Sequence, residues 1–148
     1  ELDTAPLGVV IRVMAMYRRF ARQAARALEP LDLELWEYDV LAALRRQGKP
    51  FALHAMALAR ETDLSSGAMT NRIDRLEGRG LVRRRPDKAD RRSVIVVLTT
   101  AGRKMIDKAI SYRLEAARES LEELSATERR QLSALLRKVV LSEDHLDD

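Results

Sequence analysis

The chain of 148 residues contains no cysteine. This absence excludes disulfide bonds, catalytic thiols, cysteine-based zinc sites and iron–sulfur clusters, and it favours a cytoplasmic protein. No apolar run approaches the 18 or so residues that a transmembrane helix needs, and no secretory signal is recognisable, so we expect no membrane partner. The composition, 46% hydrophobic and 34% charged, is typical of one globular domain.

Residues that stack or catalyse are also scarce. Aromatic side chains make up 4% of the sequence, too few to favour a single-stranded nucleic acid as partner. The two histidines, His54 and His145, have neither metal-ligand spacing nor a cysteine to pair with. We therefore expect no enzyme activity, no metal and no cofactor, and for His54 a solvated or helix-capping role.

Positive charge is concentrated in one part of the chain. The formal net charge is +4, but segment 72–92 alone holds nine basic and four acidic residues, and the remainder is slightly acidic. Such a concentration is typical of a surface that binds a polyanion, although a merely solvated basic helix and loop is the alternative. Because stacking residues are few, double-stranded DNA fits better than a single strand.

Apolar periodicity predicts a mainly helical chain. Apolar residues recur at three- and four-residue steps over 7–28, opposite an arginine-rich face, which predicts a long amphipathic helix that Pro30 ends. The other elements expected are helices at 35–46, 52–62, 65–78 and from 99 or 100 onward, strands at 81–85 and 93–98, and a last helix that a capping box begins at Ser125 and Glu128. A helix, a tight turn, a second helix and a basic hairpin are typical of a winged helix–turn–helix with a wing of two or three strands.

Several fragments of the chain, in their order and spacing, resemble the MarR family of winged-helix transcription regulators. They are DVLAAL at 39–44, SSGAMTNRIDRLE at 65–77, GLV at 80–82, DRRS at 90–93 and LT at 98–99. The resemblance implies a homodimeric, ligand-responsive regulator, of the repressor kind, that binds a pseudo-palindromic duplex operator and is released by a small anionic aromatic effector. A winged helix that binds DNA or docks a partner without any effector is the alternative.

The same resemblance divides the chain, which it covers from 1 to 148. It implies a DNA-binding lobe at 34–100 and dimerisation helices at 5–30 and 101–142. The apolar stripes of these terminal helices are longer than a compact winged helix of this size can bury, which independently favours a dimer.

Short polar or basic side chains on the predicted helix 65–78 are the candidates for contact with DNA. Hydroxyl groups suit phosphates, whereas Asn71 and Arg75 can each pair with a base edge through two hydrogen bonds. Ser65 can equally be the N-cap of its helix, a role compatible with a phosphate contact. The full set on this helix is Ser65, Ser66, Thr70, Asn71 and Arg75.

In the hairpin, the family pattern places an aspartate two residues before an arginine that enters the minor groove. Asp90 and Arg92 occupy these positions. The resemblance therefore implies that Asp90 orients Arg92 by charge-assisted hydrogen bonds. Lys88 and Arg91 are expected to contact phosphates, or nothing.

Three positions, Asp39, Arg72 and Arg84, resemble the urate- and phenolic-responsive branch of the family. The resemblance places small anionic aromatic ligands in the crevice between the DNA-binding lobe and the dimerisation helices, with Trp36 as the fourth candidate residue. The alternative for the acid and the arginines is a structural salt bridge without a ligand. The alternative for Trp36 is plain packing. That branch also carries a tryptophan on its first helix, which 7–28 lacks, so the identity of the acid is left open.

Overall fold

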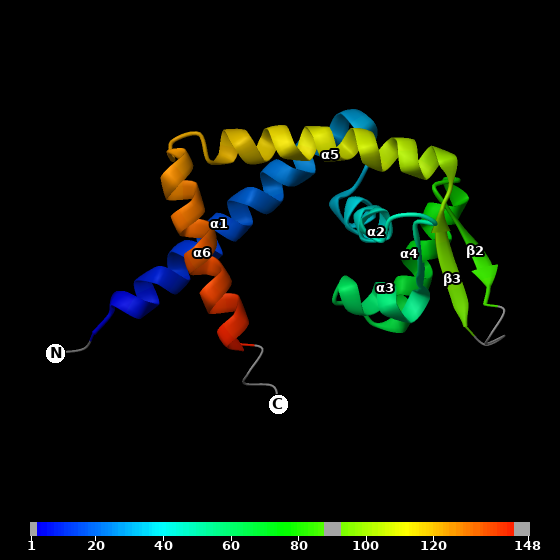
Figure 1. The fold of residues 1–148 in the computed structure, drawn as a ribbon, viewed down its shortest axis with the longest axis horizontal. Coiled ribbons are helices and arrows are strands. Elements are labelled where there is room, and N and C mark those ends of the chain that lie inside the picture. The colour runs from blue at the N-terminus through cyan, green and yellow to red at the C-terminus, as the bar shows by residue number, and fades with distance from the viewer. Residues whose placement is uncertain (1–2, 88–92, 144–148) are drawn as a thin grey trace.

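In the computed structural model, which describes residues 3–87 and 93–143, one long helix spans two ends of different character (Figure 1). Short helices and a small sheet form one end, and the N-terminal part of α1 lies with α6 at the other. The elements are α1 (Ala5–Leu28), a 3-10 turn (Glu29–Leu31), α2 (Leu35–Arg46), β1 (Ala52–His54), α3 (Ala55–Glu61), α4 (Ser66–Gly78), β2 (Val82–Pro86), β3 (Val94–Leu98), the long helix α5 (Thr100–Ser120) and α6 (Ala126–Glu143). The predicted mainly helical fold with a small wing is confirmed.

The sheet has three antiparallel strands in the order β1–β3–β2. Leu53 of β1 lies opposite Val96 of β3, and Arg84 of β2 lies opposite the same residue on the other side. The predicted helix over 52–62 is wrong for its first three residues, which form β1, and α3 begins at Ala55. The cause is non-local: the free edge of β3 offers backbone hydrogen bonds that three isolated residues cannot find within their own segment.

One core joins α2, α4 and the sheet to α5. The residues Leu41, Leu44, Leu76, Val96 and Ile106 are completely buried. Since these residues come from four elements, the lobe and the start of α5 are held together by a single apolar cluster.

Predicted caps begin three of the helices. The Thr99 hydroxyl accepts from the Gly102 N–H at 2.9 Å at the start of α5, and the Ser65 hydroxyl accepts from the Ala68 N–H at 3.3 Å at the start of α4. Before α6, the Ser125 N–H donates to the Glu128 carboxylate at 2.8 Å, as the predicted capping box requires.

The terminal helices expose apolar side chains. Only the C-terminal part of the predicted stripe on α1, at Ala24 and Leu28, is buried within the described chain. There Gln23 donates to the Ala116 carbonyl at 3.2 Å, which joins α1 to α5. Exposed large apolar residues on α1 and α6 include Leu7, Val10, Ile11, Met14, Tyr17, Leu135, Val140 and Leu141. None of the described helices is long and apolar enough to span a membrane.

The first turn of α5 rests directly on the backbone that leads into the wing. A Cβ added at Gly102 would overlap the carbonyl oxygen of Leu81, whereas one added at the helical Gly78 would meet nothing within 4 Å. We expect Gly102→Ala to lower the free energy of unfolding by about 2 kcal/mol or more, because backbone atoms cannot give way as a flexible side chain does. The control Gly78→Ala leaves stability unchanged or raises it by up to about 1 kcal/mol.

Urea unfolding followed by circular dichroism, at equal protein concentrations, measures both changes. A Gly102→Ala variant as stable as the Gly78→Ala control would show that α5 does not rest on Leu81.

Candidate nucleic-acid interface

Helix α4 presents the predicted recognition residues to solvent. Its buried side consists of Met69, Ile73 and Leu76, and at 100° per residue the opposite side is centred close to Asn71. Ala68 is apolar but exposed, because it lies roughly 100° from the centre of the buried side. The residues predicted on this helix for contact with DNA are all exposed: Ser65, Ser66, Thr70, Asn71 and Arg75.

Two of the hydroxyl groups already make local hydrogen bonds. The Ser65 oxygen caps the helix, and the Thr70 hydroxyl donates to the Ser66 carbonyl at 2.9 Å. Ser65 is thus the N-cap, and its own hydrogen remains available to a phosphate because the cap bond uses only an acceptor lone pair.

The base of the wing is tied together by His54. Its Nδ1 lies 2.9 Å from the Ser93 hydroxyl and its Nε2 3.7 Å from the Asp87 carboxylate. His54 occupies the N-cap position of α3, but its side chain makes no capping hydrogen bond and is exposed, so of the two roles expected for it the solvated one is observed. The candidate residues at the tip, Lys88, Asp90, Arg91 and Arg92, lie outside the described residues.

Arg84 links the wing strand β2 to one flank of α4. Its guanidinium is 2.6 Å from Asp74 and 2.5 Å from Glu77, and its backbone N–H donates to Glu77 at 2.9 Å. These hydrogen bonds, first from the backbone and then from the side chain of Arg84, lower the pKa of Glu77 against the small opposing effect of burial. Two carboxylates of the recognition helix are therefore neutralised from the wing.

On the other flank of α4, a hollow of about 400 Å³ opens toward α2. It is lined by Asp39, Arg46, Glu61, Thr62, Asp63 and Arg72. The guanidinium of Arg72 also lies 5.2 Å from the centre of the Trp36 ring. The structure thus brings Arg72 together with Asp39 and Trp36, as predicted, but Arg84 is placed on the opposite flank.

The carboxyl group of Asp39 is exposed yet partly desolvated. Desolvation raises its pKa, and the opposing charges of Arg113, Arg72 and Arg46 do not fully offset this effect. Among residues 3–87 and 93–143, the ion pairs do not include one between Asp39 and Arg72. Asp39 and Arg72 therefore lie beside the hollow without a direct salt bridge between them.

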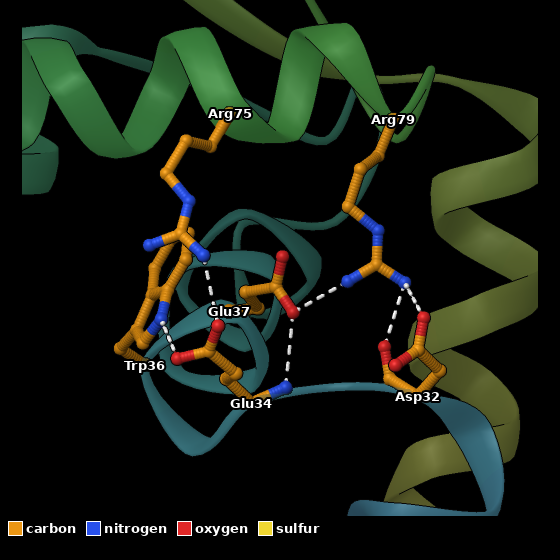
Figure 2. Close-up of polar contacts among 6 residues, drawn as sticks. All are labelled: Asp32, Glu34, Trp36, Glu37, Arg75 and Arg79. Carbon is orange, nitrogen blue, oxygen red and sulfur yellow. Dashed lines mark hydrogen bonds and ion pairs between the residues drawn. The ribbon is translucent and has the colours of Figure 1, made fainter.

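Two arginines of α4 reach across to the start of α2 (Figure 2). Arg75 donates to Glu34 at 2.8 Å, and its guanidinium lies 4.7 Å from the centre of the Trp36 ring. Trp36 donates from its indole nitrogen to the second oxygen of Glu34 at 2.7 Å. The half-buried Trp36 also packs against the core, so packing is an observed role of this residue.

Arg79, which caps the C-terminal end of α4, makes the second contact. It donates to Glu37 at 2.6 Å and to the Asp32 carbonyl at 2.6 Å (Figure 2). Glu37 is 1% exposed, and the oxygen that faces Arg79 also accepts from the Glu34 N–H at 2.9 Å. A buried carboxylate needs such partners, so this cluster fixes the end of α4 against the start of α2.

Sequence reasoning missed Glu34, Glu37 and Arg79. The available signal was local: acidic residues at the N-cap and third positions of α2 form a capping box, which the pattern Glu-x-x-Glu before an apolar run indicates. Nothing comparable marks Arg79, whose partners lie more than 40 residues away in the chain.

Comparison with known proteins connects this geometry to one family. Residues 31–93 match the model of the MarR family. The chain is 33% identical to the transcriptional regulator PecS of Dickeya dadantii over 146 residues, which cover 99% of the chain and 86% of that protein.

Two solved structures are also similar to the chain. One is a mutant MarR of Escherichia coli complexed with operator DNA, with 29% identity, a TM-score of 0.79, and coverage of 94% of this chain and 98% of that one. The other is BpsR of Bordetella bronchiseptica, whose DNA binding is regulated by 6-hydroxynicotinic acid, with 26% identity, a TM-score of 0.77, and coverage of 95% and 96%.

The raised pKa of Asp39 predicts a pH-dependent effect of its removal. Because the folded chain holds this proton more tightly than the unfolded chain, ionisation costs stability as the pH rises through the raised pKa. We expect Asp39→Asn to raise the free energy of unfolding at neutral pH, by less than about 1 kcal/mol since solvent still screens the side chain. Below the usual pKa of an aspartate the difference vanishes.

Urea unfolding at a series of pH values measures this difference. Asp63→Asn, an exposed residue at the same hollow, is the matched control. A stability gain for Asp39→Asn that persists in acid would contradict the assigned cause.

Proposed function

Because the chain belongs to the MarR family, we propose that it is a homodimeric, ligand-responsive transcription regulator, acting as a repressor on a pseudo-palindromic duplex operator. The observation that carries this proposal is the exposed polar side of α4, next to a basic hairpin and set on a rigid apolar core. Such a helix fits the major groove, where polar side chains distinguish base pairs.

The proposed dimer forms through the terminal helices, 5–30 and 101–142, and leaves 34–100 as the DNA-binding lobe. Its support is the apolar surface that α1 and α6 expose at the end of the molecule remote from the sheet (Figure 1). Contiguous apolar surface of this kind is typical of a protein interface. Pairing two copies puts two α4 helices on one face, about 34 Å apart if they enter successive major grooves.

In the proposed complex, Asn71 and Arg75 contact bases. The hydroxyls of Ser65, Ser66 and Thr70 contact phosphates. Asp90 orients Arg92 in the minor groove, while Lys88 and Arg91 add phosphate contacts. The similar E. coli protein, solved with its operator, supports the use of this fold on duplex DNA.

Operator binding should depend on both the recognition helix and the wing. We expect Asn71→Ala and Arg92→Ala each to cost about 1–3 kcal/mol of operator affinity. Arg92→Ala also lowers the salt dependence of binding if Arg92 neutralises a phosphate. The control Arg118→Ala removes a positive charge from an exposed residue of α5 and leaves operator affinity unchanged.

Fluorescence anisotropy of a labelled operator at several salt concentrations measures these changes, and sedimentation confirms that each variant stays dimeric. The proposal would be refuted if the operator affinity of the wild type did not depend on salt concentration, or if the wild type were monomeric at micromolar concentration.

The proposed effector is a small anionic aromatic acid that enters the hollow beside Asp39 and Arg72, next to the ring of Trp36. The acid takes the Arg72 guanidinium as its partner. Because desolvation raises its pKa, Asp39 takes up a proton more readily than an ordinary aspartate, and the protonated side chain donates to the ligand carboxylate. The regulation of BpsR by 6-hydroxynicotinic acid supports this class of ligand.

Release from DNA follows from where Arg72 is anchored. Since Arg72 belongs to α4, a ligand that draws its side chain into the hollow biases the position of the recognition helix. Arg84 sits on the far flank of α4, and we assign it the transfer of that bias to the wing strand through Asp74 and Glu77. A coupling of roughly 1–3 kcal/mol lowers operator affinity about 5- to 150-fold.

The effector proposal is tested by operator affinity with and without saturating 6-hydroxynicotinic or salicylic acid. We expect the wild type to lose affinity within the stated range, and Arg72→Ala and Asp39→Ala, each of which removes a donor to the ligand, to lose most of that response. Arg60→Ala, an exposed arginine of α3 that does not line the hollow, keeps it. Variants that respond fully would place the ligand elsewhere, and a wild type that no aromatic acid releases would favour the regulator without an effector.

A further inference from the structure

Arg75 and Arg79 cross from α4 to the same corner of α2, but their partners differ in exposure (Figure 2). The carboxylate that receives Arg79 is buried, whereas the side chains of Arg75 and Glu34 are 55% and 59% exposed. An ion pair as exposed as the second contributes little to stability, because solvent screens it and side-chain entropy opposes it. The main effect of the Glu34–Arg75 contact is therefore on the position of the Arg75 side chain.

Glu34 holds Arg75 in one place because Glu34 is itself held. One oxygen accepts from Arg75 Nη2 and the other from the indole nitrogen of Trp36, while the ring of Trp36 lies against the guanidinium. Glu34 is the N-cap residue of α2, so the helix fixes the backbone from which this carboxylate extends. Hydrogen bonds from Trp36 and then Arg75 lower the pKa of Glu34, which keeps the carboxylate charged at neutral pH.

The contact leaves most of the guanidinium available. A guanidinium carries five N–H donors, and within residues 3–87 and 93–143 the guanidinium of Arg75 makes one hydrogen bond, to Glu34. Arg75 lies four residues after Asn71 and so flanks the exposed side of α4. An arginine held at this place can donate two parallel hydrogen bonds to O6 and N7 of guanine.

We propose that Glu34 and Trp36 are positioning residues for Arg75, and that Arg75, held in this way, reads one guanine of each operator half-site. This inference rests on the proposed binding of α4 to duplex DNA. Holding the arginine before the complex forms removes part of the entropy that a free side chain loses on binding, and it favours the one base whose acceptors match the fixed donors.

The test uses an operator selected by the full-length wild-type dimer from random duplexes. Affinity is then measured for this operator, for duplexes in which each G·C pair is replaced in turn by A·T, and for an unrelated duplex. The variants are Arg75→Ala, Glu34→Gln and their combination. Glu29→Gln is the matched control: it makes the same change of charge five residues away, at an exposed carboxylate that is not part of the Arg75 and Arg79 contacts.

We expect Arg75→Ala to lower operator affinity roughly 10- to 100-fold and to abolish discrimination at one G·C pair. Glu34→Gln lowers affinity about 3- to 10-fold, weakens discrimination at that same pair, and adds nothing in the Arg75→Ala background. Binding to the unrelated duplex is unchanged or slightly stronger, because a negative charge has been removed. Glu29→Gln leaves discrimination intact at every pair.

Each of the following results would overturn the inference. Tighter operator binding by Glu34→Gln with unchanged discrimination would show that Glu34 sequesters Arg75. An equal loss on every duplex would assign Glu34 a purely structural role, and a uniform loss for Arg75→Ala would make Arg75 a phosphate contact. If the wild type selects no sequence, the proposed function fails as well; if it does and Glu34→Gln reads it unchanged, only this inference fails.

Discussion

The buried carboxylate of Glu37 sets the position of the recognition helix. Removed from water, it must find donors inside the protein, and it takes them from the backbone at the start of α2 and from Arg79. Because Arg79 caps the C-terminal end of α4, its contact with Glu37 fixes that end of the helix to α2. Packing of the apolar core then fixes the rest of α4. Removing Arg79 leaves an unpaired buried charge, which is far more costly than the loss of an exposed ion pair.

From this fixed end, the two flanks of α4 reach different parts of the molecule. Arg72 and Arg75 face α2 and the hollow, and Arg84 reaches in from the wing to the carboxylates of Asp74 and Glu77. Arginines thus offset acidic groups on both flanks, which keeps negative charge from dominating the side that would approach a polyanion. Because α4 contacts both the hollow and the wing, a displacement of α4 caused by a ligand in the hollow would also move the wing.

Features encoded within one segment were predictable from the sequence, whereas those made across segments were not. The bounds of α2 followed from apolar periodicity, and the caps at Ser65 and Ser125 followed from the residues next to them. Strand β1 was missed because three residues carry no period of their own. Arg84 was grouped with Asp39 and Arg72 through the family resemblance, and the sequence does not tell on which flank of a helix a neighbouring strand places its side chain.

The only tryptophan of the chain is Trp36, and it stands where the hollow, the N-cap of α2 and the recognition helix meet. Its ring has two guanidinium groups within 5.2 Å of its centre, and its nitrogen donates to a carboxylate. The wavelength of indole emission depends on the electric field across the ring, so the tryptophan emission of each chain originates from a single, strongly polarised position. The molecule therefore carries an intrinsic optical probe of the corner in which its two proposed binding events would meet.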